Sequence, residues 1–281
     1  MFGSSKPAHQ FSSSVLTYGS IDFGNTPSSA RGDGFAAMLF GMASKIEILA
    51  YELTPLGPLC LRRRELLFQP GTFVTEVTLN HEFLMSSLYT DSERTLAETA
   101  IEMHGGSHLR VLVGGLGLGY TTHQTLLSDR VASVEVAELL PEVIEWMKNG
   151  LVPLSHSLST DERVTLTTCD VYQRLLNPAQ SRFDLILIDV DHSPDERLDE
   201  HIEESDATFY TELGLRSAKE HLNDGGILGV WSYAQSSPFV DALNNVFDEV
   251  RVQDVSYQNE LVDEHCTDWL FFARRNDAGI E

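Results

Sequence analysis

The chain has 281 residues, 42% of them hydrophobic, and a formal net charge of −23 at pH 7, a size that suits one α/β domain with a small additional module. The excess of acidic over basic residues argues against nucleic acid as a partner, because its phosphates are also negative. No apolar run is as long as a membrane-spanning helix, which needs about 20 residues. Three cysteines, odd in number and far apart in the sequence, are typical of a reducing compartment, so we expect a cytoplasmic protein without a membrane partner.

The two ends and the first elements of the chain differ in character. Residues 1–41 are rich in Ser and Gly without a hydrophobic period, which predicts a flexible tail; residues 277–281 form a second, short tail. Residues 42–90 predict a small β domain. Its strands are predicted at Ile46–Leu53, Leu59–Glu65 and Thr75–Leu79.

A glycine cluster follows the next predicted strand. Val111–Val113 is a short apolar β run, and Gly114, Gly115, Gly117 and Gly119 follow it before a helix-compatible segment at 121–127. Glycines at a strand-to-helix turn expose backbone N–H groups without side chains in the way, a geometry that suits a nucleotide. A tight structural turn is the alternative interpretation of this pattern alone.

Three further predicted strands end at acidic residues. Residues 131–137 lead to Glu138, residues 164–169 lead to Asp170, and residues 183–188 lead to Asp189. Ligands of open parallel sheets bind outside the carboxyl ends of the strands, and an acid about 20 residues after the glycines suits a ribose diol. We therefore predict a nucleotide site at this edge.

This series resembles the class I S-adenosylmethionine (SAM)-dependent transferases and, within them, the spermidine synthase-like family. The resemblance covers roughly residues 83–274. It implies that the glycine loop and Glu138 bind the donor's nucleoside and that Asp170 and Val171 lie beside adenine. It also implies that Asp189 contacts the donor and is the general base of the segment Asp189-Val-Asp-His-Ser-Pro194.

The resemblance also implies the architecture. We expect an α/β fold in which residues 91–276 form a doubly wound, mostly parallel, seven-stranded Rossmann-like sheet with an antiparallel C-terminal edge. The small N-terminal β domain precedes it and makes a homodimer the expected assembly. Near the C-terminus the pattern predicts a helix at 238–247, strands at 249–255 and 268–274, and a polar loop at 257–266 without an assigned role.

Departures from the family pattern bear on the reaction. Gly117 stands where spermidine synthases carry an Asp that meets the donor's amino end, which favours ordinary SAM, because backbone N–H groups accept its carboxylate. Leu96, Ala97 and Glu98 stand where the family has a Tyr-(His or Gln)-Glu triplet that helps to bind the amine. Asp191 and His192 occur where Ser and Asp are expected.

The expected function is therefore an enzyme that moves an alkyl group, with methyl favoured, from a SAM-type donor to a small cationic amine. The alternatives are a polyamine aminopropyltransferase that uses decarboxylated SAM and a non-catalytic nucleotide-binding protein. Asp189, Asp191 and His192 are the candidate catalytic residues. They could also hold a divalent ion, but the position of Asp189 in the fold favours general-base work, and no metal is expected.

The remaining candidates concern the substrates. Met85 and Ser86 are predicted to contact the methionyl part of the donor, and Trp231 and Tyr233 are predicted to face the acceptor. Aromatic rings there can cover an alkyl chain or a cation. Residues 191–206 contain eight acids and one Arg, which indicates either a soluble lid or a negative mouth that attracts a cationic acceptor.

Overall fold

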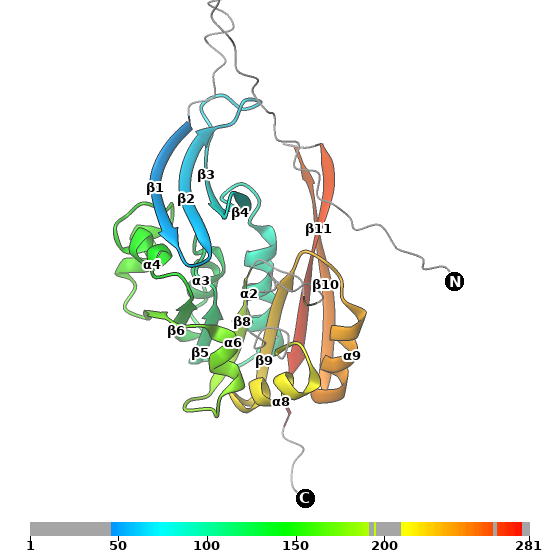
Figure 1. Ribbon diagram of the computed structural model, residues 1–281. Helices are drawn as coiled ribbons and strands as arrows, with labels where there is room; N and C mark the ends of the chain where they lie inside the picture. Colours follow the sequence, from blue (N-terminus) through cyan, green and yellow to red (C-terminus); the bar gives the residue numbers. More distant parts are fainter. Residues whose placement is uncertain (1–45, 191–193, 195–208, 261–262, 277–281) are drawn as a thin grey trace, which may run out of the picture. The chain divides into compact units, whose positions relative to one another are not determined.

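A computed structural model describes residues 46–190, 194, 209–260 and 263–276 (Figure 1). These residues form a four-stranded sheet and a seven-stranded sheet with helices on both faces of the larger one. The predicted tails, the candidate residues Asp191 and His192, and residues 195–206 of the acid-rich segment lie outside the described residues.

The small sheet is antiparallel throughout, with strand order β1-β2-β3-β4. Its strands are β1 (Ile46–Thr54), β2 (Gly57–Glu65), β3 (Phe73–Leu79) and β4 (Glu82–Ser86). The sequence pattern predicted the first three strands but not β4. One face of the small sheet is buried, because Leu59, Leu61 and Val77 belong to the same apolar core as the larger sheet.

The large sheet has the strand order β10-β11-β9-β8-β5-β6-β7. Its strands are β5 (Leu109–Gly114), β6 (Val131–Glu138), β7 (Val164–Thr168), β8 (Phe183–Ile188), β9 (Leu222–Ser232), β10 (Glu249–Asn259) and β11 (Glu264–Arg274). Strands β5 to β9 pair in parallel, whereas β11 pairs antiparallel with both β9 and β10. The predicted seven-stranded sheet with an antiparallel C-terminal edge is confirmed.

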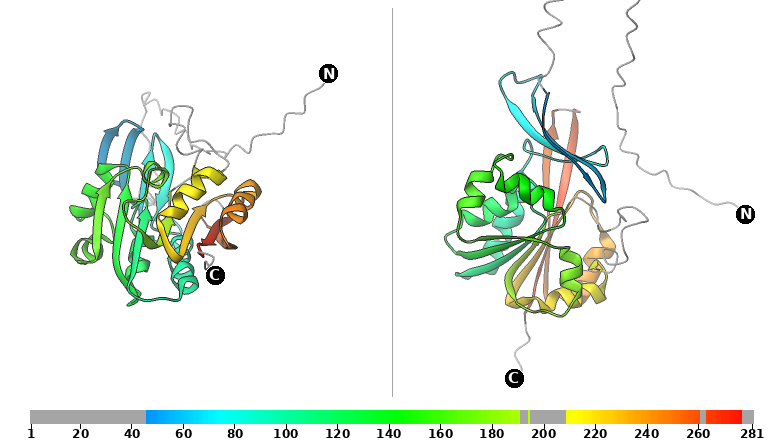
Figure 2. Two further views of the ribbon diagram at one scale, coloured as in Figure 1. Left: turned by 90° about the horizontal axis from the view of Figure 1, so that it is seen from below. Right: turned by 60° about the vertical axis from the view of Figure 1, so that its left-hand side comes forward.

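Helices cover both faces of this sheet and enclose two apolar cores (Figure 2). On one face lie α2 (Asp91–His104), α3 (Tyr120–Leu126), α4 (Pro141–Lys148) and α5 (Ser155–Thr160). On the other lie α6 (Val171–Leu176), α8 (Glu212–Glu220) and α9 (Ser237–Val246). Strands β5 and β8 are apolar on both faces because both faces are covered, as is usual for parallel strands. None of the helices within the described ranges combines the length and apolar character needed to cross a membrane.

The C-terminal hairpin is longer than the sequence pattern predicted. Strands β10 and β11 pair with each other from Glu249–Arg274 to Asn259–Glu264, so most of the predicted polar loop at 257–266 is strand. Only Trp269–Arg274 of β11 pairs with β9. The outer half of the hairpin therefore extends past the end of β9, beside the small sheet in Figure 1.

Candidate active site

The carboxyl ends of the parallel strands bring the predicted nucleotide residues to one edge of the sheet. The backbone N–H of Asp189 donates to the carbonyl of Gly114 at 2.8 Å, and that of Gly115 donates to Ala137 at 2.8 Å. The backbone of Glu138 accepts from Cys169 at 2.9 Å. The strand ends of β5, β6, β7 and β8 are thus neighbours, as a parallel register requires.

The glycine loop is closely packed against its surroundings. Gly115 has φ +94°, and a Cβ there would overlap the carbonyl of Asp189. Gly117 has φ +50°, and its Cβ would lie 3.0 Å from the sulfur of Met85. Met85, predicted to contact the donor, therefore lies against the glycine loop and occupies the space into which an acidic side chain at position 117 would extend.

Glu138 is buried behind the loop and bonds to its backbone. One carboxylate oxygen accepts from the N–H of Leu116 at 2.8 Å and the other from Leu140 at 2.8 Å. Burial raises the pKa of Glu138, and hydrogen bonds from backbone amides, including that of Gly117, oppose the rise. Glu138, the residue predicted to bind the ribose, thus holds the glycine loop through these hydrogen bonds. A bound ribose would share or replace them.

Asp170 and Val171 flank the same loop from the start of α6. The carboxylate of Asp170 caps that helix by accepting from Tyr172 at 2.8 Å and Gln173 at 3.1 Å. Val171 is buried, and a Cβ on Gly114 would come within 2.8 Å of its methyl group. The cap fixes the direction of α6 and thereby holds Val171 beside the predicted nucleotide position.

Asp189 lies directly after β8 and faces the helix that follows the glycine loop. Its carboxylate accepts a short hydrogen bond from the hydroxyl of Thr121 on α3. Burial raises the pKa of Asp189 to about 6, the Thr121 hydrogen bond opposes the rise, and the charge of Asp268 adds to it. A carboxyl group with a pKa near neutrality can take up a proton under physiological conditions.

Two further carboxyl groups, which the sequence analysis did not assign to the site, join Asp189. Burial and then the charge of Asp189 raise the pKa of Glu93 on α2 to about 8, and Asp268 on β11 contributes to the rise. Burial also raises the pKa of Asp268. We call Glu93, Asp189 and Asp268 the acid cluster. Its first and last members, Glu93 and Asp268, lie 175 residues apart in the chain, so no local sequence signal connects them.

Ser92 and Trp231 connect two members of the acid cluster. The indole N–H of Trp231 donates to the hydroxyl of Ser92 at 3.0 Å, and that hydroxyl bonds to the carboxylate of Glu93 at 3.1 Å. Hydrogen bonds with both Ser92 and Trp231 stabilise the ionised form of Asp268. The predicted acceptor residue Trp231 therefore packs against the apolar core with its ring and bonds to the acid cluster through its N–H.

Aromatic rings surround these acids. Tyr233 lies 6.5 Å from Trp231 between ring centroids, and Tyr89 stacks on Tyr257 at 4.7 Å. Burial raises the pKa of Tyr257, and the charge of Asp268 raises it further, which brings the outer half of the hairpin into the site. Aromatic faces beside carboxylates form a favourable environment for an alkylammonium group.

Other predicted residues have local roles. The hydroxyl of Ser86 accepts from the backbone of Leu88 at 3.1 Å. Leu96 and Ala97 are fully buried in the core, and Glu98 is exposed and accepts from Gln124 at 2.7 Å. The polar groups that α2 contributes to the site thus come from its first turn, at Ser92 and Glu93. They do not come from residues 96–98, where the family resemblance placed them.

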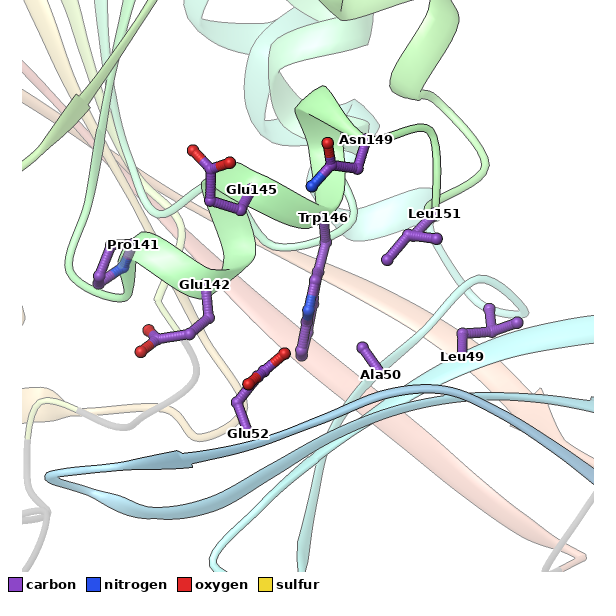
Figure 3. A pocket seen from close by; sticks show the side chains of 9 residues that line it. All are labelled: Leu49, Ala50, Glu52, Pro141, Glu142, Glu145, Trp146, Asn149 and Leu151. Carbon is purple, nitrogen blue, oxygen red and sulfur yellow. The ribbon is translucent and has the colours of Figure 1, made fainter.

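In the described part of the chain, no group of three or more His, Cys, Asp or Glu side chains is spaced to hold a metal ion. A cavity of about 500 Å³ does lie between β1 and α4 (Figure 3). Its walls are Leu49, Ala50, Glu52, Pro141, Glu142, Glu145, Trp146, Asn149 and Leu151. The residues predicted for the donor and acceptor do not line this cavity, so it is separate from the site described above.

Two solved structures with the same fold are spermidine synthases. The enzyme from Thermotoga maritima superposes with a TM-score of 0.63 at 17% identity, over 83% of this chain and 74% of that one. A spermidine synthase in complex with the transition state analogue AdoDATO gives 0.62 at 16% identity, over 83% and 75%. No protein-family model and no curated protein sequence matches the chain. The likeness shows that the chain has the same fold as these spermidine synthases.

Proposed function

We propose that this protein is a transferase that moves an aminopropyl group from decarboxylated SAM to a cationic amine, with Asp189 as the general base. The acid cluster beside the glycine loop is the observation that carries the proposal. Aminopropyl transfer was the alternative in the sequence analysis, where Gly117 favoured methyl transfer. The acid cluster and the spermidine synthase neighbours favour the alternative.

The electrostatics of the site bear on the choice of donor. SAM carries an amino group and a carboxylate at its methionyl end, whereas decarboxylated SAM carries only the amino group. A donor carboxylate beside three neighbouring acids would raise their pKa values still further, whereas an ammonium group would lower them and favour the ionised, attracting form. Gly117 stands where the family carries an Asp in the glycine loop, so the loop has one acid fewer. Glu93 on α2 places another acid beside Asp189.

The proposed reaction needs a neutral amine and a place for its proton. The amine nitrogen forms a bond to the terminal carbon of the aminopropyl group, the bond from that carbon to sulfur breaks, and sulfur leaves as a neutral thioether. Asp189 accepts the proton that the nitrogen loses. Thr121 fixes the orientation of this carboxylate through its hydrogen bond, and Met85 and Trp231 flank the reacting groups.

The loss of the family's amine-binding triplet does not count against an amine acceptor. Leu96 and Ala97 are core residues in this chain, and the first turn of α2 offers Ser92 and Glu93 in their stead. The N-terminal sheet and the long hairpin flank the site with Met85 and Tyr257. A small cationic molecule is the acceptor that this set of acids and aromatic rings suits.

Calorimetry with both donors, followed by turnover assays, tests the proposal. We expect decarboxylated SAM to bind at least about tenfold more tightly than SAM and to yield methylthioadenosine when a diamine is present. Asp189→Asn should lower kcat by about 10²-fold or more and leave donor affinity within a factor of about two. The activity of the wild type should fall below about pH 6, where Asp189 becomes protonated. Preference for SAM would overturn the proposal.

Methyl transfer from SAM is the second candidate, and the observation that favours it is Gly117. Position 117 carries no acidic side chain to repel a donor carboxylate, and only Met85 lies close to the place of its absent Cβ. Tight binding of SAM and formation of S-adenosylhomocysteine would support this candidate. Binding of either donor without turnover by any amine would support the non-catalytic alternative.

A further inference from the structure

The cavity between β1 and α4 is a second concave site, which the proposed reaction does not use (Figure 3). Its volume of about 500 Å³ lies within the range of small-molecule pockets, about 300–1,000 Å³. One wall is β1, the edge strand of the small sheet, and the other is α4 with the turn that follows it. The side chains on these walls indicate the chemistry of a ligand.

A β-bulge shapes the wall that the small sheet supplies. The pairing of β1 with β2 shifts between Ile48 and Ala50, and two consecutive residues, Leu49 and Ala50, both line the cavity. In a regular strand, consecutive side chains point to opposite faces, and a bulge changes the direction of one of them. Together with Leu151 after α4, these residues give the cavity an apolar part.

Two polar atoms at the opposite wall lack hydrogen-bond partners. Trp146 on α4 is 3% exposed, and its indole N–H has no acceptor among the described residues. One turn earlier on the same helix, Oε2 of Glu142 is shielded from solvent and has no donor in the described part of the chain. Figure 3 shows both side chains extending from α4 toward β1. Because buried polar groups are nearly always paired, these two atoms point to a ligand that offers one acceptor and one donor.

The charged residues of the lining are all acidic. They are Glu52 on β1 and Glu142 and Glu145 on α4, and within the described ranges no Lys, Arg or His lines the cavity. Lys148 pairs with Glu145 at 3.1 Å, where both side chains are exposed. The ion pairs formed by the described residues include neither Glu52 nor Glu142. The donor that Glu142 lacks is therefore best supplied by a cation, because a charged donor forms the stronger hydrogen bond with a carboxylate.

We propose that this cavity binds a small alkylammonium compound that also carries a hydroxyl or carbonyl oxygen. Its ammonium group lies at Glu142 and Glu52, and its oxygen accepts from the indole N–H of Trp146. Side chains one helical turn apart, such as those of Glu142 and Trp146, have Cβ atoms about 5–6 Å apart, so a chain of two or three carbons between nitrogen and oxygen suits them. Leu49 and Ala50 cover those carbons.

This inference does not depend on the proposed function. The residues that line the cavity are distinct from those assigned to the donor and to the acceptor, and none of them belongs to the acid cluster. Binding of the ligand is therefore measurable without a donor and without turnover.

Three matched probes test the inference on the full chain. 3-Amino-1-propanol carries both groups, propylamine lacks the hydroxyl, and 1,3-propanediol lacks the charge. We expect 3-amino-1-propanol to bind about fivefold more tightly than propylamine, the effect of one hydrogen bond. 1,3-Propanediol should bind at least about tenfold more weakly than 3-amino-1-propanol. Ligand-observed NMR titrations at low ionic strength measure the three affinities.

Two variants assign the binding to the cavity. Trp146→Phe keeps an aromatic ring but removes the N–H, so it should weaken binding of 3-amino-1-propanol about fivefold and leave propylamine unaffected. Glu142→Gln removes a charge and should weaken binding of both amines by at least about tenfold. A variant that fails to fold would lose all binding, so these two patterns differ from a loss of structure.

Two further variants serve as controls. Glu102→Gln, an exposed acid on α2, should leave all three affinities unchanged and controls for general loss of charge. Asp189→Asn alters the proposed active site and should also leave them unchanged. If Asp189→Asn abolishes binding of the amines and Trp146→Phe does not alter it, the amines bind only at the proposed active site and the inference is wrong. Equal affinities of the wild type for the two amines, or no binding of either, would overturn it as well.

Discussion

The indole N–H of Trp231 donates to the hydroxyl of Ser92 at 3.0 Å, across 139 positions of the chain. This hydrogen bond connects the end of β9 to the first turn of α2, and Ser92 passes the connection to the neighbouring Glu93. A residue predicted to face the acceptor and an acid that no motif indicated thus belong to one hydrogen-bonded group. The stability and chemistry of that group lead to testable expectations.

The acid cluster should make the protein less stable as the pH rises. The native state raises the pKa of Glu93 from 4.5 to about 8, so between these values it binds more protons than the unfolded state does. The free energy of unfolding therefore falls as the pH increases through this window. Glu93→Gln mimics the neutral acid and should raise Tm at pH 8.5 by about 4–8 °C, corresponding to about 2 kcal/mol.

Thermal melts between about pH 5 and pH 9 measure this effect, because this range spans most of the interval between the ordinary and the raised pKa of Glu93. The variant and the wild type should have similar Tm at the acidic end and diverge toward the alkaline end. Glu102→Gln, on the exposed side of the same helix, should follow the wild type throughout. A Glu93→Gln curve parallel to the wild type would contradict the expectation.

Gly115 should be intolerant of any side chain. Its φ is +94°, and an added Cβ would overlap the carbonyl of Asp189, so Gly115→Ala must displace either the glycine loop or the general base. We expect a loss of about 2–4 kcal/mol in the free energy of unfolding, measured by urea denaturation. Gly150→Ala is the matched control, because Gly150 also has positive φ, at +78°, but nothing lies within 4 Å of its added Cβ; it should lose about 1 kcal/mol. Equal losses would show that backbone strain alone, and not contact with Asp189, decides the cost.

The small sheet contains a buried acid between two arginines. Glu76 on β3 is 2% exposed, and its two oxygens contact Arg62 at 2.9 Å and Arg64 at 2.7 Å. Glu76→Gln would leave two guanidinium groups without a counter-charge and should cost about 3 kcal/mol in the free energy of unfolding. Glu47→Gln breaks the exposed pair with Arg63 and should cost less than about 1 kcal/mol. Similar losses in urea denaturation would contradict the assigned burial effect.

Local patterns in the sequence determined most of the fold. Apolar runs that end in glycine or an acid predicted β5, β6, β7 and β8 within one or two residues, because buried parallel strands need apolar side chains on both faces. The glycine loop was recognisable for a similar reason, since residues such as Gly115 have a backbone conformation and close contacts that other residues do not tolerate.

Tertiary structure decided the composition of the acid cluster. Glu93 lies in the first turn of α2, and Asp268, predicted as the first residue of a strand, lies inside the longer strand β11. What brings them to Asp189 is the antiparallel pairing of β11 with β9 and the packing of α2 on β9. The electrostatic energy of a carboxyl group depends on its distance to other charges and on its burial, and neither quantity is encoded in the residues next to it in the chain.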